Sequence, residues 1–328
     1  MYHIGVDLGG TNLAIGILDE NFQMLRKESI PTRPERGDWA VLQDMAALCR
    51  RLMQEQGLSA ADFSYAGVAA PGIANQDSGI VEYNNNLGFV NTPVADYLER
   101  EVGFRKVCLE NDANAAALGE ALAGAGKNAK IFVMVTLGTG VGGGVVFDGR
   151  VLQGAHHVGG ELGHIVMEHR NGLPCTCGRR GCIEAYCAAP ALMNRTREAM
   201  RLHPDSRMWE VSGHDLEQVS ARTVFEAVKR GDGTAENLLH EYLDDLACGL
   251  ATIINIFDPE VLALGGGLSA AEGLLEGLIP RISRETYGLK DDREKCLARE
   301  RKRVRLAELG NDAGIIGAAF LGEKHSIR

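Results

Sequence analysis

A short stretch of the chain holds one imidazole and three thiols of the kind that bind zinc: His164, Cys175, Cys177 and Cys182. A tetrahedral Zn²⁺ takes four nitrogen or sulfur ligands, and a site whose positions are all filled by protein is structural. The Cys-x-Cys-x4-Cys spacing suits a compact zinc knuckle, which His164 would complete from eleven residues upstream. The alternative is three unrelated buried thiols. We favour the zinc knuckle because all four residue types fall so close together.

Two carboxylates flank these candidate zinc ligands. Glu161 precedes His164 within Gly-Glu-Leu-Gly-His, and Glu184 follows the last cysteine within Gly-Cys-Ile-Glu. A zinc ion that only stabilised the fold would not require a carboxylate on both sides. We therefore expect the segment to hold Glu161, His164 and Glu184 rigidly and to present them to a ligand.

Three glycine-rich turns each follow a short apolar segment that reads as a strand. Glycine lets the backbone approach an anion closely and point successive N–H groups at it, and threonine adds a hydroxyl donor. A single turn of this kind is weak evidence, but three favour a nucleotide-binding cleft. The turns are Asp7-Leu-Gly9-Gly10-Thr11, Gly138-Thr139-Gly140-Val-Gly-Gly-Gly144 and Gly265-Gly266-Gly267-Leu-Ser269.

Two common nucleotide-binding motifs do not fit these turns. Gly138-x-Gly140-x-x-Gly143 matches the dinucleotide fingerprint, and Glu161 lies near the distance expected for its ribose-binding acid. That fingerprint requires a helix directly after the glycines, whereas residues 145–149 read as a strand and a turn. A Walker P-loop needs Gly-Lys-Ser/Thr after its glycines, and none of the three turns has it.

The segment Glu110-Asn-Asp112-Ala-Asn114 falls where a predicted strand ends and a predicted helix begins. Open α/β sheets bind ligands at the carboxyl ends of their strands. A carboxylate there can accept the proton of a substrate hydroxyl that attacks phosphorus. Asp112 or Asn114 could instead only cap the helix. Pattern alone leaves both interpretations of Asp112 open.

The composition is typical of a soluble globular protein, with 45% hydrophobic and 24% charged residues among 328, a length that allows two domains. The net charge of −10 argues against nucleic acid as a partner, since that would need a basic face. The basic run 299–305 is predicted to be a strand with a solvated edge. No segment approaches the ~20 apolar residues of a membrane span, and the start lacks signal-peptide features. Eight cysteines are too few for a secreted disulfide scaffold, so we expect a cytoplasmic protein with no membrane partner.

Apolar periodicity and turn residues predict alternating strands and helices. A strand, a glycine turn and two further strands occur twice, at residues 4–30 and at 131 to about 153. Two similar α/β halves with a cleft between them are the simplest architecture. The predicted strands are 4–7, 13–18, 24–30, 65–70, 106–109, 131–137, 143–147, 261–264 and 304–307, and the predicted helices are 39–56, 93–102, 114–123, 221–230, 235–257, 272–286 and 312–324.

Six motifs follow one another along the chain: Asp7-Leu-Gly-Gly-Thr11, Asn111-Asp-Ala-Asn114, Leu137-Gly-Thr-Gly-Val-Gly-Gly143, Gly160-Glu-Leu-Gly-His164, Cys175-Thr-Cys-Gly-Arg-Arg-Gly-Cys-Ile-Glu184 and Leu264-Gly-Gly-Gly-Leu-Ser269. In this order they resemble the motifs of the ROK family, which contains bacterial sugar kinases and sugar-responsive repressors. The resemblance runs from residue 4 to residue 319. It implies a two-domain hexokinase/actin-like fold, that is, a duplicated ribonuclease H-like fold with an interdomain cleft. The smaller N-terminal domain would comprise residues 1–117 and 312–328, and the larger C-terminal domain residues 118–311 with the zinc-binding segment 161–184.

The resemblance implies an ATP-dependent sugar 6-kinase. Asp112 would be the general base for the sugar 6-hydroxyl, and the first phosphate turn would place Asp7 near Mg²⁺. Zinc would orient the sugar site and take no part in the chemistry. The implied nucleotide-binding residues are Asp7, Gly9, Gly10 and Thr11 in the first phosphate turn, Gly138, Thr139 and Gly140 in the second, and Gly265, Gly266 and Gly267 against adenosine.

The same resemblance implies how the sugar is bound. His164 would place one ring nitrogen on zinc and the other towards the sugar, and Gly72 would approach the sugar through its backbone. Small-molecule sugar and ATP would be the partners, and the protein would be a homodimer or a homotetramer. The implied sugar-binding residues are Gly72, Asn86, Asn111, Asp112, Glu161, His164 and Glu184.

The identity of the sugar remains open. The segment 84–89 and the intact Leu137-Gly-Thr-Gly motif resemble the glucose-specific members of the family, so we expect glucose. N-acetylmannosamine, N-acetylglucosamine, fructose and allose remain alternatives, as does a phosphoryl donor other than ATP. Repressor members carry a helix-turn-helix before the first strand, and here that strand begins within five residues of Met1. A non-catalytic sugar-sensing regulator would be expected to lack Asp112 or a phosphate turn, and neither is lost.

Overall fold

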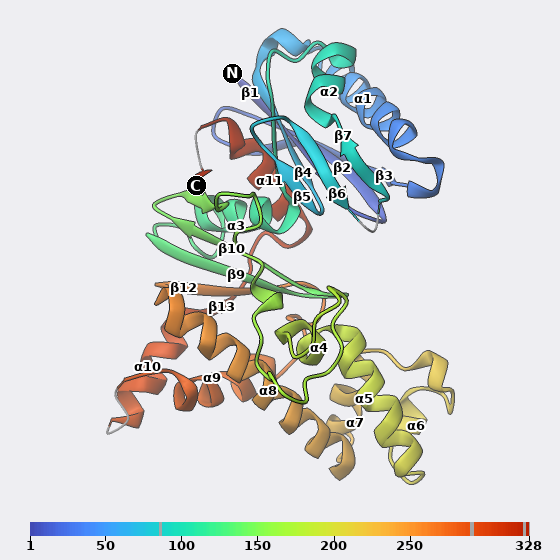
Figure 1. Ribbon diagram of the computed structural model, residues 1–328, viewed down its shortest axis with the longest axis vertical. Helices are drawn as coiled ribbons and strands as arrows, with labels where there is room; N and C mark the ends of the chain where they lie inside the picture. Colours follow the sequence, from blue (N-terminus) through green and yellow to red (C-terminus); the bar gives the residue numbers. More distant parts are fainter. Residues whose placement is uncertain (85–86, 289–291, 324–325, 328) are drawn as a thin grey trace. The chain divides into compact units, whose positions relative to one another are not determined.

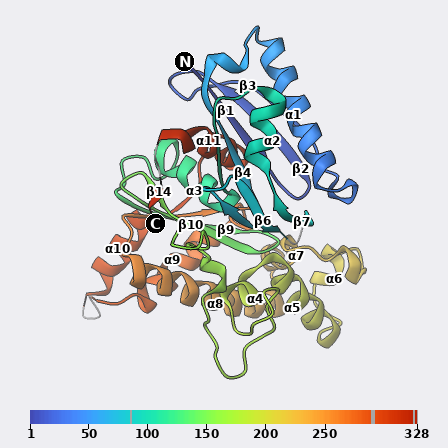
Figure 2. The ribbon, with the colours of Figure 1, turned by 45° about the horizontal axis from the view of Figure 1, so that its top comes forward.

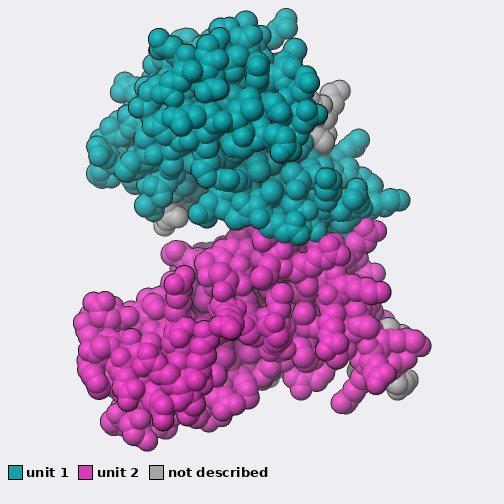
Figure 3. All heavy atoms as spheres, turned by 180° about the vertical axis from the view of Figure 1, so that it is seen from behind, with its two compact units in different colours: residues 1–132, 144–160, 308–328 teal, residues 133–143, 161–307 magenta. Residues whose placement is uncertain are grey.

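The computed structural model describes residues 1–84, 87–288, 292–323 and 326–327. The chain forms two compact units, coloured separately in Figure 3. Unit 1 contains residues 1–132, 144–160 and 308–328, and unit 2 contains residues 133–143 and 161–307. The two units are defined by which residues pack together. The predicted domains, residues 1–117 with 312–328 and residues 118–311, divide the chain differently and remain a prediction.

Unit 1 is built on a five-stranded sheet with the strand order β3-β2-β1-β4-β8 (Figure 1). β1, β2 and β3 form an antiparallel meander, whereas β4 is parallel to β1 and β8 is parallel to β4. Parallel strands end at the same edge of a sheet, so Asp7 and Asn111 at the ends of β1 and β8 lie on one edge. The strands are β1 (Tyr2–Leu8), β2 (Asn12–Leu18), β3 (Met24–Pro31), β4 (Phe63–Ala70) and β8 (Val107–Asn111).

Helices cover both faces of this sheet (Figure 2). Ile4 and Val6 on β1 are buried with the apolar residues of α1 (Asp38–Glu55) and α2 (Val94–Val102). Successive residues of a strand face opposite sides, so Gly5 faces α11 (Ala313–Phe320), which packs beside α3 (Asp112–Ala123). A Cβ on Gly5 would lie 2.0 Å from the carbonyl oxygen of Ile315. Glycine therefore lets α11 lie directly on the strand backbone.

A small antiparallel sheet follows β4 and was not predicted from the sequence. It consists of β5 (Ile73–Asn75), β6 (Ile80–Asn84) and β7 (Phe89–Thr92) in that order. These strands are short and include asparagine and glutamate, which are depleted in strands. The sheet carries the turn after β5, which holds Gln76 and Asp77.

The second sheet repeats the order of the first. Its strand order is β13-β12-β9-β10-β11-β14. Read from β11 to β13, it matches β3 to β8 of the first sheet strand for strand. This confirms the predicted repetition of a strand, a glycine turn and two more strands. The strands are β9 (Ile131–Leu137), β10 (Val141–Phe147), β11 (Arg150–Leu152), β12 (Val261–Gly265), β13 (Val304–Leu306) and β14 (Ser326–Ile327).

Unit 2 contributes most of the remaining helices: α4 (Ile183–Cys187), α5 (Ala189–Leu202), α6 (Met208–Val211), α7 (Arg222–Lys229), α8 (Gly233–Phe257), α9 (Leu274–Glu285) and α10 (Arg293–Arg303). The short 3-10 helices of the chain are Pro34–Arg36, Ala60–Asp62, Leu162–His164, Leu216–Gln218, Gly310–Asp312 and Leu321–Glu323. The predicted final helix over 312–324 is therefore split, because α11 ends at Phe320 and a 3-10 turn follows. None of the helices in the described ranges is long and apolar enough to cross a membrane.

The prediction of a strand over the basic run 299–305 was wrong for most of its length. Residues 299–303 are the last turns of α10. Glu300 is completely buried there, and Arg299 Nε donates to its Oε1 over 2.8 Å. Arg303 Nη1 lies 3.7 Å from Glu300 Oε2, one turn further along the helix. The buried residues of this segment are charged, so an apolar pattern could not reveal the helix.

Candidate active site

The start of helix α3 is capped by Asn111. Its Oδ1 accepts hydrogen bonds from the backbone N–H groups of Ala113 at 2.9 Å and Asn114 at 3.1 Å. This corrects the alternative in which Asp112 or Asn114 serves as the cap. Asp112 accepts a hydrogen bond from the Ala113 N–H at 2.9 Å, and the same N–H also donates to Asn111 Oδ1. The carboxylate is thus not needed to cap the helix.

The amide of Asn111 reaches a second predicted residue. Its Nδ2 donates to the carbonyl oxygen of Gly72 over 3.1 Å. Gly72 has a φ of 91°, and a Cβ there would lie 2.2 Å from the carbonyl oxygen of Tyr83. The turn can adopt this conformation only with glycine. Unit 1 therefore brings together Gly72, Asn111 and Asp112.

Two carboxylates of unit 1 lie close enough to influence each other. Burial raises the pKa of Asp7 to about 7, and the negative charge of Asp112 adds to the rise. Burial also raises the pKa of Asp112 itself. Asp7 packs so closely on α11 that a Cβ on Gly314 would lie 2.6 Å from its Oδ2. Such paired carboxylate oxygens fit a hard cation such as Mg²⁺.

The first glycine turn is fixed by hydrogen bonds. Gly9 N donates to the carbonyl oxygen of Asn12 over 2.8 Å, and Thr32 Oγ1 donates to the carbonyl oxygen of Gly9 over 2.7 Å. Thr32 N donates to the carbonyl oxygen of Thr11 over 2.9 Å. Gly10 and Thr11 themselves are exposed. The turn is a rigid, open surface of the kind that a phosphate group can approach.

Unit 2 brings the other two glycine turns together. Leu268 N donates to the carbonyl oxygen of Leu137 over 3.1 Å, which joins the turn after β12 to the turn after β9. Gly138 N donates to the carbonyl oxygen of Gly140 over 3.0 Å. A Cβ on Gly138 or on Gly267 would meet no protein atom within 4 Å. Both glycines therefore border open space.

Glu184 connects the turn after β9 to the cysteine-rich segment. Its Oε2 accepts a hydrogen bond from Val141 N over 3.0 Å, and a Cβ on Gly140 would lie 2.5 Å from the same oxygen. Its Oε1 accepts hydrogen bonds from Thr176 Oγ1 and from Cys175 Sγ. Thr176 was not among the predicted site residues. Its position between two candidate zinc ligands was the only signal.

The four candidate zinc ligands converge. His164 Nδ1 and the Sγ atoms of the cysteines all lie within 4.8 Å of one another. His164 Nδ1 lies 3.6 Å from Cys175 Sγ, and Cys177 Sγ lies 3.8 Å from Cys182 Sγ. A tetrahedral zinc with ordinary bond lengths separates a nitrogen and a thiolate by about 3.6 Å and two thiolates by about 3.8 Å. The donor set and its spacing therefore fit zinc. Nδ1 belongs to the cluster, and Nε2 is the remaining ring nitrogen.

Two further predicted sugar-binding residues complete the description. Glu161 is exposed and precedes the 3-10 helix Leu162–His164, and its carbonyl oxygen accepts a hydrogen bond from His164 N over 3.1 Å. Asn86 lies outside the described residues. The predicted sugar-binding residues thus fall into two groups, Gly72, Asn111 and Asp112 in unit 1 and Glu161, His164 and Glu184 in unit 2.

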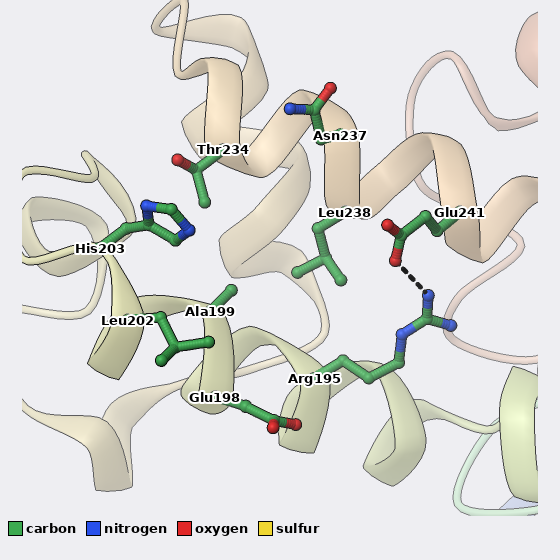
Figure 4. A pocket seen from close by; sticks show the side chains of 9 residues that line it. All are labelled: Arg195, Glu198, Ala199, Leu202, His203, Thr234, Asn237, Leu238 and Glu241. Carbon is green, nitrogen blue, oxygen red and sulfur yellow. Dashed lines mark hydrogen bonds and ion pairs between the residues drawn. The ribbon is translucent and has the colours of Figure 1, made fainter.

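Unit 2 also has a pocket that contains none of the predicted residues. It lies between α5 and α8 (Figure 4). The ion pair of Arg195 Nη2 with Glu241 Oε2, at 3.1 Å, borders it, and Leu238 and His203 line it. We therefore do not include this pocket in the candidate active site.

Known proteins resemble this chain over almost its entire length. The ROK family model matches residues 3–325. The glucokinase of Thermotoga maritima is 36% identical over 324 residues, which cover 97% of this chain and 96% of that protein. The N-acetyl-D-glucosamine kinase of Aliivibrio fischeri is 32% identical over 333 residues, which cover 99% and 100%. A crystal structure of a ROK family glucokinase from Streptomyces griseus, in complex with glucose and AMPPNP, matches with a TM-score of 0.78 and 29% identity over 98% of this chain and 99% of that one.

Proposed function

Because the chain belongs to the ROK family, we propose that it is an ATP-dependent hexose 6-kinase and that glucose is its substrate. The observation that carries this proposal is the carboxylate of Asp112 at the start of α3, beside Asp7 and not required as a helix cap. The similarity to glucokinases over the full chain supports it.

Asp112 is the general base in this proposal. The sugar O6 attacks the γ-phosphorus of ATP while its proton passes to a carboxylate oxygen of Asp112. The bond between the γ-phosphorus and the oxygen shared with the β-phosphate breaks, and ADP leaves. Burial raises the pKa of Asp112, which strengthens it as a base as long as it stays ionised.

The glycine turns bind the nucleotide in this proposal. Backbone N–H groups of residues 9–11 and 138–140 would hold the phosphates, and residues 265–267 would lie against adenosine. Asp7 would hold Mg²⁺. When bound, Mg²⁺ neutralises charge on the transferring phosphoryl group.

We assign sugar binding to side chains that match hydroxyl groups in hydrogen-bonding character. The carboxylates of Glu161 and Glu184 would accept from sugar hydroxyls, and His164 would face the sugar with Nε2. Zinc on the four clustered ligands would hold this segment in place without entering the reaction. The full assignment is Gly72, Asn86, Asn111, Asp112, Glu161, His164 and Glu184.

A second candidate is an N-acetylated amino sugar, favoured by the 32% identity to an N-acetyl-D-glucosamine kinase. A non-catalytic sugar sensor accounts less well for the retained Asp112 and three glycine turns. We also propose a homodimer or a homotetramer with no nucleic-acid partner, located where ATP is available, in the cytoplasm.

The deciding experiment is a sugar panel. Purified protein is incubated with ATP, Mg²⁺ and one sugar at a time, and ADP release is followed by a coupled assay. We expect the highest kcat/KM with glucose. A higher value with N-acetylglucosamine or N-acetylmannosamine would replace glucose by that sugar. No ADP release with any sugar, from protein shown to bind glucose, would favour the sensor.

A further inference from the structure

Glu110 is a buried carboxylate two residues before Asp112, and the residue is only 2% exposed. Burial raises its pKa to about 7, while four hydrogen bonds lower it. All four donors are uncharged groups. Burying a carboxylate without a cation is unfavourable unless its oxygens are fully hydrogen-bonded. An apolar side chain at this position would leave the four donors without their acceptor, so the acid and its donors form one network.

The four donors come from three separate segments of unit 1. Glu110 Oε1 accepts hydrogen bonds from Asn111 N at 2.8 Å and from Asn114 Nδ2 at 3.2 Å, both at the start of α3. Glu110 Oε2 accepts from Gln76 Nε2 and from Gln153 Nε2, each at 2.5 Å. Gln76 lies in the turn after β5, and Gln153 directly follows β11. One carboxylate thus joins three segments that are far apart in the sequence.

These segments adjoin the proposed sugar-binding residues. Strand β5 joins Gly72 to Gln76, and the carbonyl oxygen of Gly72 accepts the hydrogen bond from Asn111 Nδ2. The segment after β11 is folded back on itself, because Gly159 N donates to the carbonyl oxygen of Gln153 over 2.7 Å. Glu110 and Asn111 therefore hold the segment 72–76, which contains β5, against the start of α3 at two points.

We propose that Glu110 is a positioning residue for Asp112 and for the segment 72–76. Its two oxygens fix the start of α3, which carries Asn111 and Asp112, relative to the Gln76 turn and to Gln153. The inference rests on the proposed sugar kinase activity. It concerns the hydrogen bonds of Glu110, and the carboxylate itself does not touch the substrate.

The first test is Glu110→Met, which keeps the length of the side chain and removes both acceptors. A misplaced base or sugar contact lowers turnover steeply, so we expect kcat to fall at least ~10-fold and the KM for sugar to rise. The KM for ATP should stay unchanged, because Glu110 does not hold the glycine turns. Circular dichroism and thermal unfolding would establish that the variant is folded.

Glu120 provides a matched control. It is also a fully buried glutamate of unit 1, and its oxygens accept from Ala125 N at 2.9 Å and Leu309 N at 2.6 Å. It lies two turns further along α3 from Asp112. Glu120→Met should lower thermal stability and leave kcat and both KM values unchanged. Equal changes of kcat in the two variants would overturn a specific role for Glu110.

Two milder variants keep the proposal testable if Glu110→Met fails to fold. Gln76→Met and Gln153→Met each remove one donor, and each should lower kcat or raise the KM for sugar several-fold. Unchanged constants in both would overturn the proposal. Glu110→Gln should recover most of the kcat lost in Glu110→Met, because Gln76 and Gln153 can turn their amide oxygens towards the new NH₂ group. A Glu110→Gln variant as impaired as Glu110→Met would overturn a role through hydrogen bonds.

The wild-type protein separates this inference from the proposed function. Sugar phosphorylation by the wild type together with normal kinetics of Glu110→Met and the glutamine variants rejects only the positioning role. A wild type that phosphorylates no sugar rejects the proposed function itself.

Discussion

Asn111 joins the start of helix α3 to Gly72, because its Nδ2 donates to the carbonyl oxygen of Gly72 over 3.1 Å while its Oδ1 caps the helix. A single side chain therefore fixes the direction of α3 and the position of the turn at Gly72. The Asp112 carboxylate follows in the next residue. The turn and the proposed base should respond together to a change at either end of this hydrogen bond.

We predict that Gly72→Ala weakens both stability and sugar binding. A Cβ there would lie 2.2 Å from the carbonyl oxygen of Tyr83, and the φ of 91° is unfavourable for alanine. The free energy of unfolding should fall by about 1–3 kcal/mol, and the KM for sugar should rise because the partner of Asn111 moves. Urea unfolding and the coupled assay measure the two effects.

Gly57→Ala is the control for this change. Gly57 has a φ of 66°, but a Cβ there would meet nothing within 4 Å. Gly57→Ala introduces the unfavourable positive φ for alanine but no steric clash, so its KM for sugar should equal that of the wild type. A wild-type KM in Gly72→Ala as well would argue against Gly72 as part of the sugar site.

Asp112→Asn should abolish turnover and leave sugar binding nearly intact. The amide keeps the size of the side chain but cannot accept the proton of the sugar hydroxyl, so kcat should fall ~100-fold or more. Calorimetric titration with glucose should give a Kd close to that of the wild type. Asp205→Asn, at an exposed position of unit 2, should change neither value. Equal loss of turnover and of sugar binding in Asp112→Asn would indicate a structural role instead.

The residues that could carry the chemistry were predictable from the sequence, whereas the contacts that position them were not. Asp112 could be singled out because a strand, an acid and a helix start are neighbours in the sequence. The sequence could not show whether Asp112 caps the helix. The structure shows that Asn111 is the cap, because its Oδ1 accepts hydrogen bonds from the backbone N–H groups of Ala113 and Asn114. Glu110 was visible as well, but Gln76 and Gln153 lie 34 and 43 residues away. No local pattern links them to Glu110.

Helix α10 and strands β5 to β7 were missed because they lack the apolar periodicity on which the predictions depended. Helix α10 is rich in charges, and its buried face includes Glu300 and Arg303 rather than a stripe of aliphatic residues. Strands β5 to β7 are three to five residues long, so alternation has little room to emerge. The duplicated sheets were predictable because β1 and β9 are both short segments with buried apolar residues that precede a glycine turn.

Removal of zinc should lower stability and sugar affinity together. The four ligand atoms lie within 4.8 Å of one another, and Thr176, which lies between two of these ligands in the sequence, donates a hydrogen bond from its Oγ1 to Glu184 Oε1. Loss of the metal should therefore free the segment that carries His164 and Glu184. We expect metal analysis to find stoichiometric zinc, and a strong chelator to lower both Tm and glucose affinity.

Cys177→Ser and Cys248→Ser form a matched pair for this prediction. Both cysteines are exposed, and only Cys177 belongs to the cluster. Cys177→Ser should lose zinc, whereas Cys248→Ser should retain it and bind glucose as the wild type does. Zinc-free wild-type protein with full sugar affinity would disprove the knuckle as the support of the sugar site.

Gly138→Ala should affect ATP and leave the fold unchanged. A Cβ at Gly138 would meet no protein atom within 4 Å, so the free energy of unfolding should stay near that of the wild type. If the phosphates of ATP approach this backbone, the added methyl group would keep them away and raise the KM for ATP several-fold. Gly233→Ala, where a Cβ also meets nothing within 4 Å, should leave this KM unchanged. An unaltered KM for ATP in both variants would remove Gly138 from the phosphate site.

The buried carboxyl of Glu110 predicts a pH-dependent stability. Burial raises its pKa from 4.5 to about 7, so the folded protein keeps this proton over a range in which the unfolded chain has released it. The stability from Glu110 is thus fully present below about pH 4.5 and is lost as the pH rises to about 7. At about 1.4 kcal/mol per pKa unit, the loss is about 3 kcal/mol.

Glu110→Gln isolates this effect because glutamine does not titrate. Asp7 and Asp112, whose pKa values are also raised, titrate in both proteins, so their contributions cancel. The groups that surround Glu110 are the amides of Gln76, Gln153 and Asn114 and the backbone of Asn111, none of which titrates. The free energy of unfolding of the wild type minus that of Glu110→Gln should therefore decrease between pH 5 and pH 7, by up to ~3 kcal/mol, and then level off. Urea unfolding at each pH gives this difference, and a difference that stays constant would show that Glu110 is already ionised in the folded protein at pH 5.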